Sequence, residues 1–163
     1  METRPKIKIS LSAADKTIAF TAWCALVAIW LLPALAYHTL PDNIITHLNG
    51  AGKVTDTGSK LTVFITPAIG TFVFLLLHVV AMYPHALNYP VTITEANAAK
   101  QYTLATKTLR ILKLCIALLF IGINCEMMFP AINELIGAWT LPISTAIIFA
   151  PLTFLIVKSY RNK

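Results

Sequence analysis

The sequence predicts an all-α integral membrane protein with four transmembrane helices, both termini in the cytoplasm and an ordered extracytoplasmic loop between the first two helices. Hydrophobic residues make up 57% of its 163 residues, and Asp, Glu, Lys and Arg together make up 12%. Soluble domains carry about 25% charged residues. This composition leaves too little charge to cover a soluble surface, which excludes a soluble enzyme, a disordered chain and a nucleic-acid-binding domain.

Long stretches without Asp, Glu, Lys or Arg define three of the four spans. Residues 17–41, 61–94 and 135–157 lack these charged residues, and a membrane helix needs about 20 apolar residues. A fourth span is long enough if Lys113 reaches one membrane surface with its flexible stem and Glu126 lies near the other. The predicted spans are 18–40, 61–83, 111–129 and 136–157, in a single domain covering residues 1–163.

The distribution of basic residues supports four spans and sets their orientation. The three basic clusters are Arg4, Lys6, Lys8 and Lys16, then Lys100, Lys107, Arg110 and Lys113, then Lys158, Arg161 and Lys163. Only Lys53 and Lys60 fall in the first loop. Four spans place all three clusters on the cytoplasmic side, as the positive-inside rule prefers. Cleavage of the first span as a secretory signal at Leu31–Ala36 is the alternative, but its apolar stretch is longer than a usual signal core.

The predicted outer loop, residues 41–60, concentrates polar chemistry. Asp42 is positioned to cap a short helix that would stop at Asn49-Gly50. This helix would run through Ile44, Ile45 and Leu48. A nucleotide-binding P-loop is excluded because Val54, and not Ser or Thr, follows the Gly52-Lys53 pair.

This loop resembles the opening motif of SdpI-like bacterial membrane proteins, the domain of unknown function numbered sixteen forty-eight. The residues that carry the resemblance are Leu40, Pro41, Ile44, His47, Asn49, Gly52, Gly58, Ser59 and Lys60. A second block from Tyr83 to Tyr102 is similar to the family's stretch after the second span. The resemblance implies a multi-pass protein of the bacterial cytoplasmic membrane. It also implies a possible role in immunity or signalling, because the family includes a toxin-immunity protein that signals through a cytoplasmic repressor.

The predicted inner segment, residues 92–110, reads as an amphipathic helix that continues into the third span. Thr92 and Glu95 fit a capping box, and an apolar face runs from Ala98 through Tyr102 to Leu112. Two interpretations stay open: a basic collar that attracts anionic lipids, or a docking face for a cytoplasmic regulator. The candidate residues on this side are Glu95, Asn97, Lys100, Tyr102, Lys107 and Arg110.

Ionisable residues at membrane depth give the outer candidates. A Glu126–Lys60 ion pair under the loop is one interpretation, and a ligand-binding cluster of His38, His47, Lys60 and Glu126 is another. A metal site of His38, His47 and Glu126 is a third, although no tight ligand spacing supports it. The candidate ligand- or partner-binding residues are His47, Asn49, Gly52, Ser59, Lys60 and Glu126. His78 in the second span is either hydrogen-bonded structurally or functional.

Two classes of function follow. The first is a non-enzymatic sensor, immunity or accessory protein in the lipid bilayer, whose outer loop binds a secreted peptide or toxin, a lipid or a protein. The second is a small transporter or membrane enzyme that uses the outer polar cluster. No cofactor is expected, no nucleic acid is a partner, and no catalytic triad or metal motif is recognisable.

Overall fold

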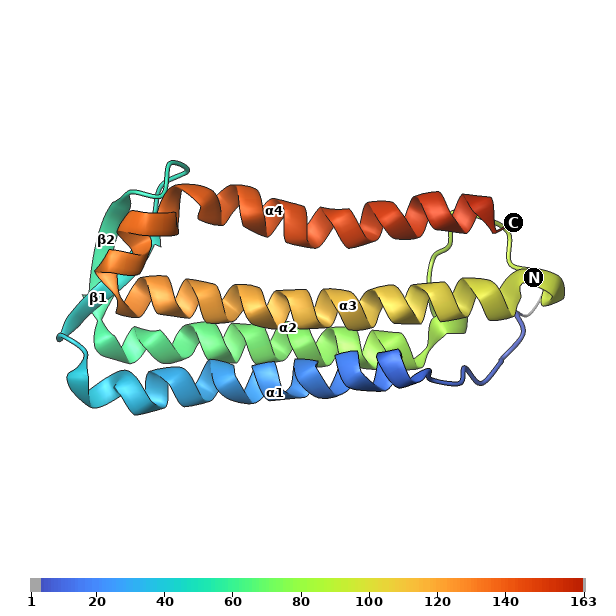
Figure 1. The fold of residues 1–163 in the computed structure, drawn as a ribbon, viewed down its shortest axis with the longest axis horizontal. Coiled ribbons are helices and arrows are strands. Elements are labelled where there is room, and N and C mark those ends of the chain that lie inside the picture. Colours follow the sequence, from blue (N-terminus) through green and yellow to red (C-terminus); the bar gives the residue numbers. More distant parts are fainter. Residues whose placement is uncertain (1–3, 163) are drawn as a thin grey trace.

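The computed structural model describes residues 4–162, so Lys163 of the predicted inner basic cluster lies outside the described residues. Four long helices run side by side, with α3 between α4 and the α1–α2 pair (Figure 1). They are α1 (Ala13–Ala36), α2 (Ile65–Met82), α3 (Glu95–Met128) and α4 (Pro130–Arg161). Both chain ends lie at one end of the bundle, here called the termini end, and a β-hairpin lies at the other, the hairpin end (Figure 1).

All four helices are long and apolar enough to cross a membrane. Short 3-10 segments lengthen the first two, because η1 (Tyr37–Thr39) follows α1 and η2 (Lys60–Phe64) precedes α2. The predicted number of helices is therefore confirmed, and the chain is a multi-pass membrane protein by the length and composition of its helices.

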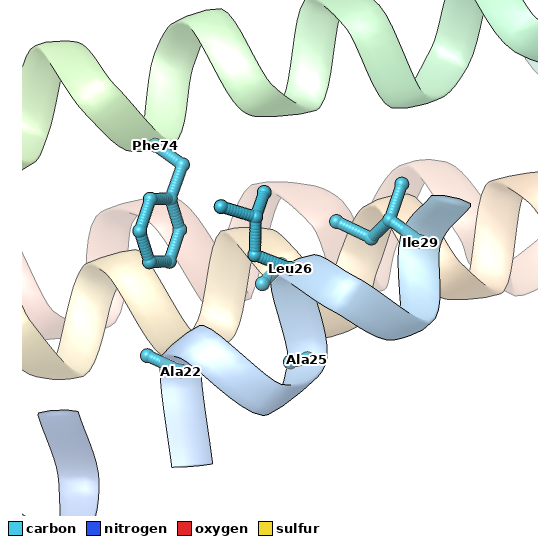
Figure 2. Close-up of a cluster of buried hydrophobic side chains, with 6 residues drawn as sticks. Ala22, Ala25, Leu26, Ile29 and Phe74 are labelled. Atoms are coloured by element: carbon cyan, nitrogen blue, oxygen red, sulfur yellow. The ribbon is translucent and has the colours of Figure 1, made fainter. Parts of the chain in front are cut away.

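Close packing of α1 on α2 and α3 builds an apolar core. Ala22 and Ala25 present no side chain beyond Cβ, so neighbouring helices can approach α1 closely. Figure 2 shows Phe74 reaching from α2 towards α1, and Leu26 and Ile29 rising from α1 towards α2. Ala117 of α3 completes this buried cluster.

Pro33 lies inside α1 and removes one helical hydrogen bond. Its missing N–H leaves the carbonyl of Ile29, four residues earlier, without its usual helical partner. The buried Asn124 of α3 donates to that carbonyl at 3.4 Å. A neighbouring helix thus satisfies the group that the proline frees, as apolar surroundings require.

The loop between α1 and α2 is a β-hairpin, so the predicted short helix is wrong. Strand β1 (Asn43–Leu48) pairs in antiparallel fashion with β2 (Val54–Ser59). β-Branched side chains, which favour strands over helices, make up half of each segment. Ile44 and Ile45 are both buried: Ile44 packs in a cluster with Val63 and Met128, and Ile45 lies on the side of the hairpin that faces the cavity described below.

Helix α3 runs without interruption from the loop after α2 to the residue before Phe129. Its first residue is Glu95, and Thr94 is the N-cap, with its backbone N–H donating to the Asn97 side chain at 2.9 Å. The predicted Thr92–Glu95 capping box is therefore wrong by two positions. Asn97 also donates to the Thr92 carbonyl at 3.0 Å, which fixes the chain as it enters the helix.

Candidate functional site

A cavity of about 670 Å³ lies at the hairpin end. Its walls come from both hairpin strands and from α2 and α3, and Thr140 adds a contribution from α4. Isoleucine, leucine, methionine and threonine side chains make up most of the lining. A concave, mainly apolar site with a few polar groups is the usual form of a ligand pocket.

Glu126 is the buried acidic residue of this cavity. Its side chain comes from the last turn of α3, and the residue is only 3% exposed. Oε1 accepts a hydrogen bond from the Thr140 hydroxyl of α4, whereas Oε2 has no hydrogen-bond partner. A buried carboxylate oxygen without a hydrogen-bond donor is costly. Oε2 is therefore the atom of this site that most needs a donor.

Lys60 does not reach Glu126, so the predicted ion pair is wrong. The Lys60 ammonium instead lies 3.0 Å from the Asp42 carboxylate and 5.4 Å from the centre of the Tyr37 ring. The hairpin explains this, because its base places the two residues together and the Lys60 N–H donates to the Asp42 carbonyl at 2.9 Å. A helical loop would not have brought them into register.

His47 and Asp56 face each other across the hairpin. The His47 Nδ1 lies 3.6 Å from the Asp56 carboxylate, and both side chains are about two-thirds or more exposed. Both residues line the cavity, on the hairpin wall. Of the six candidate outer residues, His47 and Glu126 are the two that line the main cavity.

Asn49 and Gly52 shape the hairpin turn. The Asn49 side-chain oxygen accepts from the backbone N–H groups of Ala51 and Lys53 at 2.9 and 3.0 Å. Gly52 has φ +75°, and a Cβ there would lie 2.0 Å from the backbone of Gly137 in α4. Asn133 of α4 donates to the Gly52 carbonyl at 3.3 Å. The turn is therefore anchored on the beginning of α4.

Ser59 completes the hairpin end by starting η2. Its hydroxyl accepts from the Leu61 N–H at 3.4 Å, and its carbonyl accepts from the Thr62 hydroxyl at 2.7 Å. Asn49, Gly52, Ser59 and Lys60 thus have local structural contacts that shape and position the hairpin. His38 is stacked edge-on against Tyr37 and does not line the cavity.

The cavity is acidic in a basic protein. Among its lining residues are two acids, Asp56 and Glu126, and no Lys or Arg, although the whole chain has 13 Lys and Arg against 7 Asp and Glu. Across residues 4–162, no group of three His, Cys, Asp or Glu is placed to hold a metal ion. The predicted metal site of His38, His47 and Glu126 is therefore not assembled.

At the termini end, the structure divides the six inner candidates. Glu95, Lys100 and Lys107 are exposed. Arg110 turns inward to pair with Asp15 of α1 at 3.1 Å, and both side chains are nearly buried. Tyr102 is fully buried and packs on Tyr89 with ring centres 5.6 Å apart.

Tyr89 belongs to the connection between α2 and α3, which lies at the termini end of the bundle (Figure 1). Burial raises the pKa of its hydroxyl, which therefore stays protonated and donates to the Pro84 carbonyl at 2.9 Å. Arg4 lies over the Tyr89 ring and donates to the His85 and Leu87 carbonyls. The N-terminal segment is thus fastened to this connection. Asn97 is partly buried and serves the N-cap of α3 described above.

The buried contact between Gln101 and the end of α4 escaped the sequence analysis. Gln101 is fully buried, donates to the Ser159 and Asn162 carbonyls at 3.0 Å and accepts from the Ser159 hydroxyl at 2.6 Å. It therefore ties α3 to the end of α4. A signal was present, because Gln101 lies at helical spacing between Ala98 and Ala105 on a face that the structure buries.

Lys113 does not extend to the membrane surface, so the predicted snorkelling is wrong. The residue is 3% exposed, and its ammonium lies 3.2 Å from the His78 Nδ1. It also lies 4.6 Å from the centre of the Phe74 ring and 5.6 Å from that of Trp23. Aromatic faces attract a cation, which compensates part of its desolvation. His78, one of the open questions of the sequence, is the polar neighbour of this cation.

Comparison with known families identifies one part of the chain. Residues 24–71 match the family described as a domain of unknown function, DUF1648. The DUF1648 segment comprises the greater part of α1, the whole hairpin and the beginning of α2. It contains the hairpin wall of the cavity, whereas Glu126 lies outside it. The predicted DUF1648 resemblance is confirmed for these residues. No curated protein and no solved structure matches the chain.

Proposed function

We propose that this chain is a non-enzymatic membrane protein of the SdpI-like kind, a sensor, immunity factor or accessory protein, whose hairpin-covered cavity binds an amphipathic ligand. The observation that carries the proposal is the cavity itself. The DUF1648 hairpin forms one wall, helices form the others, and the lining is apolar except for a few polar groups. Such a site suits a peptide, a lipid or a protein segment that presents an apolar body and a polar end.

The orientation forms part of the proposal. Apart from Lys113, which is buried within α3, and Lys163, which lies outside the described residues, the clustered basic residues belong to the termini end, so this end faces the cytoplasm of a bacterial cell and the hairpin faces outward. A cysteine introduced at Lys53 is expected to react with a membrane-impermeant thiol reagent on intact cells. A cysteine at Arg161 is expected to react only after lysis, and equal labelling of both from outside would contradict the orientation.

The structure weakens the alternative of an enzyme or transporter that uses an outer polar cluster. That alternative needed His38, His47, Lys60 and Glu126 to meet. Lys60 is held by Asp42, and His38 does not line the cavity. Of the remaining pair, His47 faces Asp56 and Glu126 accepts from Thr140, so neither is directed to the other as a base is to a nucleophile.

Filling the cavity tests whether it binds ligands. Dodecanol is a neutral probe with an apolar chain, and the full-length protein in phosphatidylcholine nanodiscs is its receptor. Ile123 lines the cavity, whereas Ile156 is a half-exposed residue of α4 elsewhere on the bundle. Ile123→Trp is expected to reduce the dodecanol bound, as counted by native mass spectrometry, and the same change at Ile156 is expected to leave it unchanged. Equal binding by both variants would overturn the proposal.

A further inference from the structure

We propose that the ligand of this cavity is a single-chain amphiphile with a primary ammonium head, held by Glu126, whose alkyl chain runs into a slot between α3 and α4. The inference rests on the proposed function, because it assumes that the cavity binds a ligand. It adds the chemical class of that ligand and the direction in which it lies.

The first argument is the Glu126 carboxylate oxygen that has no hydrogen-bond donor. Glu126 is 97% buried (3% exposed), its Oε1 accepts from Thr140, and its Oε2 lacks a donor while the residue lines the cavity. A buried carboxylate needs donors or an opposite charge, and the charge-assisted hydrogen bond from an ammonium is among the strongest available. A ligand ammonium would therefore supply what the protein leaves missing.

The second argument is the sign of the charge in the cavity. Asp56 stands on the hairpin wall and Glu126 at the α3 wall, with no Lys or Arg among the lining residues. An alkyl sulfate or a carboxylate would meet two acids here without a Lys or Arg partner. His47 is already directed towards Asp56 at 3.6 Å, which leaves Glu126 as the group available to a ligand head.

The third argument is the slot that continues from Glu126. A second cavity of about 150 Å³ lies between α3 and α4 and shares Ile123, Glu126 and Thr140 with the first. The rest of its lining is Gly122 and aliphatic side chains such as Leu118 and Ile147. At Gly122 a Cβ would meet nothing within 4 Å, so this position is open.

Depth along α3 fits the two halves of an amphiphile. Glu126 lies two residues before the end of the helix, about 3 Å from it, and the proposed orientation puts this end of α3 at the outer face of the bilayer. Leu118 lies eight residues further in, about 12 Å deeper, at the level of hydrocarbon. A polar head at Glu126 with its chain towards Leu118 would therefore be oriented as it is in the surrounding bilayer.

Three dodecyl probes that share the same chain separate charge from apolar contact. Dodecylamine, dodecanol and dodecanoate are added to the full-length protein in phosphatidylcholine nanodiscs at neutral pH, and bound probe is counted by native mass spectrometry. The wild type is expected to bind dodecylamine roughly tenfold more tightly than dodecanol, the ratio set by one charge-assisted hydrogen bond. Dodecanoate is expected to bind most weakly.

Two variants locate the ammonium. Glu126→Gln keeps the shape and removes the charge, and it is expected to abolish the amine preference while dodecanol binding persists. Asp42→Asn is the matched control, because Asp42 is an acid at the same end that pairs with Lys60 and does not line the cavity. It is expected to retain the preference. An unchanged amine preference in Glu126→Gln would overturn the proposal.

One further variant tests the slot without touching the carboxylate. Gly122→Leu fills the open position, so it is expected to weaken dodecylamine binding at least several-fold while the helix remains intact. Unchanged binding would overturn the placement of the chain. Equal binding of dodecanol and dodecylamine to the wild type would overturn the ammonium proposal and leave the cavity as a binding site. Binding of none of the probes would overturn the proposed function as well.

Discussion

The two ends of the bundle differ in whether their buried polar groups have hydrogen-bond partners. At the termini end, the Asp15 carboxylate accepts from Ser12 and Arg110, and Gln101 uses both its amide nitrogen and its oxygen on α4. At the hairpin end, Glu126 is equally buried but has one oxygen without a partner, beside a large cavity. Satisfied buried groups hold helices together, whereas an unsatisfied one beside a cavity is a place for a ligand.

The contrast has an informative exception at the termini end. The buried Tyr102 hydroxyl also lacks a hydrogen-bond partner. A neutral hydroxyl is less costly to leave unpaired than a carboxylate, and its ring packs on Tyr89. Tyr102 lines neither the main cavity nor the slot between α3 and α4. An unpaired polar group alone therefore does not indicate a ligand site. An adjoining cavity is also needed.

The largest expected effect comes from breaking the Asp15–Arg110 pair. Arg110→Met strands the nearly buried Asp15 carboxylate and is expected to lower the free energy of unfolding by roughly 3 kcal/mol. Thermal unfolding in mild detergent measures it. Lys100→Met removes a basic residue from an exposed position of the same helix and is the control. Equal effects of the two changes would show that the pair does not stabilise the termini end.

Gln101→Leu tests the second tie at the termini end. The change removes three hydrogen bonds to α4 and leaves the buried Ser159 hydroxyl without its acceptor. We expect a loss of about 2 kcal/mol in the free energy of unfolding. Hydrogen exchange at the end of α4 should increase as well. Unchanged exchange there would mean that α4 is held by other contacts.

Gly52→Ala tests how firmly the hairpin is anchored. The residue has φ +75°, and the new Cβ would collide with the backbone of Gly137. We expect a local cost of about 2 kcal/mol and faster protease cleavage of the turn. Gly50→Ala, where a Cβ meets nothing within 4 Å, is the matched control. Equal cleavage of both variants would contradict the docking of the turn on α4.

The hydrophobic pattern was sufficient to predict the helices but not what lies between them. Charge-free stretches and the basic clusters predicted four helices because span length and flanking charge are local properties of a sequence. The hairpin was mistaken for a helix on the strength of Asp42 and Asn49-Gly50. The same Asn-Gly pair between the β-branched runs at Ile44 and Val54 also fits a hairpin, and tertiary contact with α4 stabilises that outcome.

The errors in the predicted site have the same cause, because they also depend on contacts between distant parts of the chain. Pairing of Lys60 with Asp42 depends on the hairpin register, which the helical interpretation could not supply. Lys113 lies inward because two aromatic rings and His78 receive it, and these come from two other helices. The sequence predicted that the charge of Glu126 is costly at membrane depth, but it could not predict the partner Thr140, which lies on α4, or the cavity, which needs the whole fold.

The smallest expected effect concerns the hydrogen bond that links α1 to α3 near the hairpin end. Asn124→Leu removes the donor to the Ile29 carbonyl, which Pro33 leaves without its helical partner, and should cost about 1 kcal/mol. Pro33→Ala restores an N–H at position 33, so the helix can satisfy Ile29 by itself. In the double variant the Asn124→Leu cost should therefore shrink towards zero, giving a positive coupling in a double-mutant cycle of thermal unfolding. Strict additivity would show that Asn124 does not compensate for the proline. Asn124 is buried, and its own side-chain oxygen has no hydrogen-bond partner. Its burial would then need a functional explanation, as we propose for Glu126.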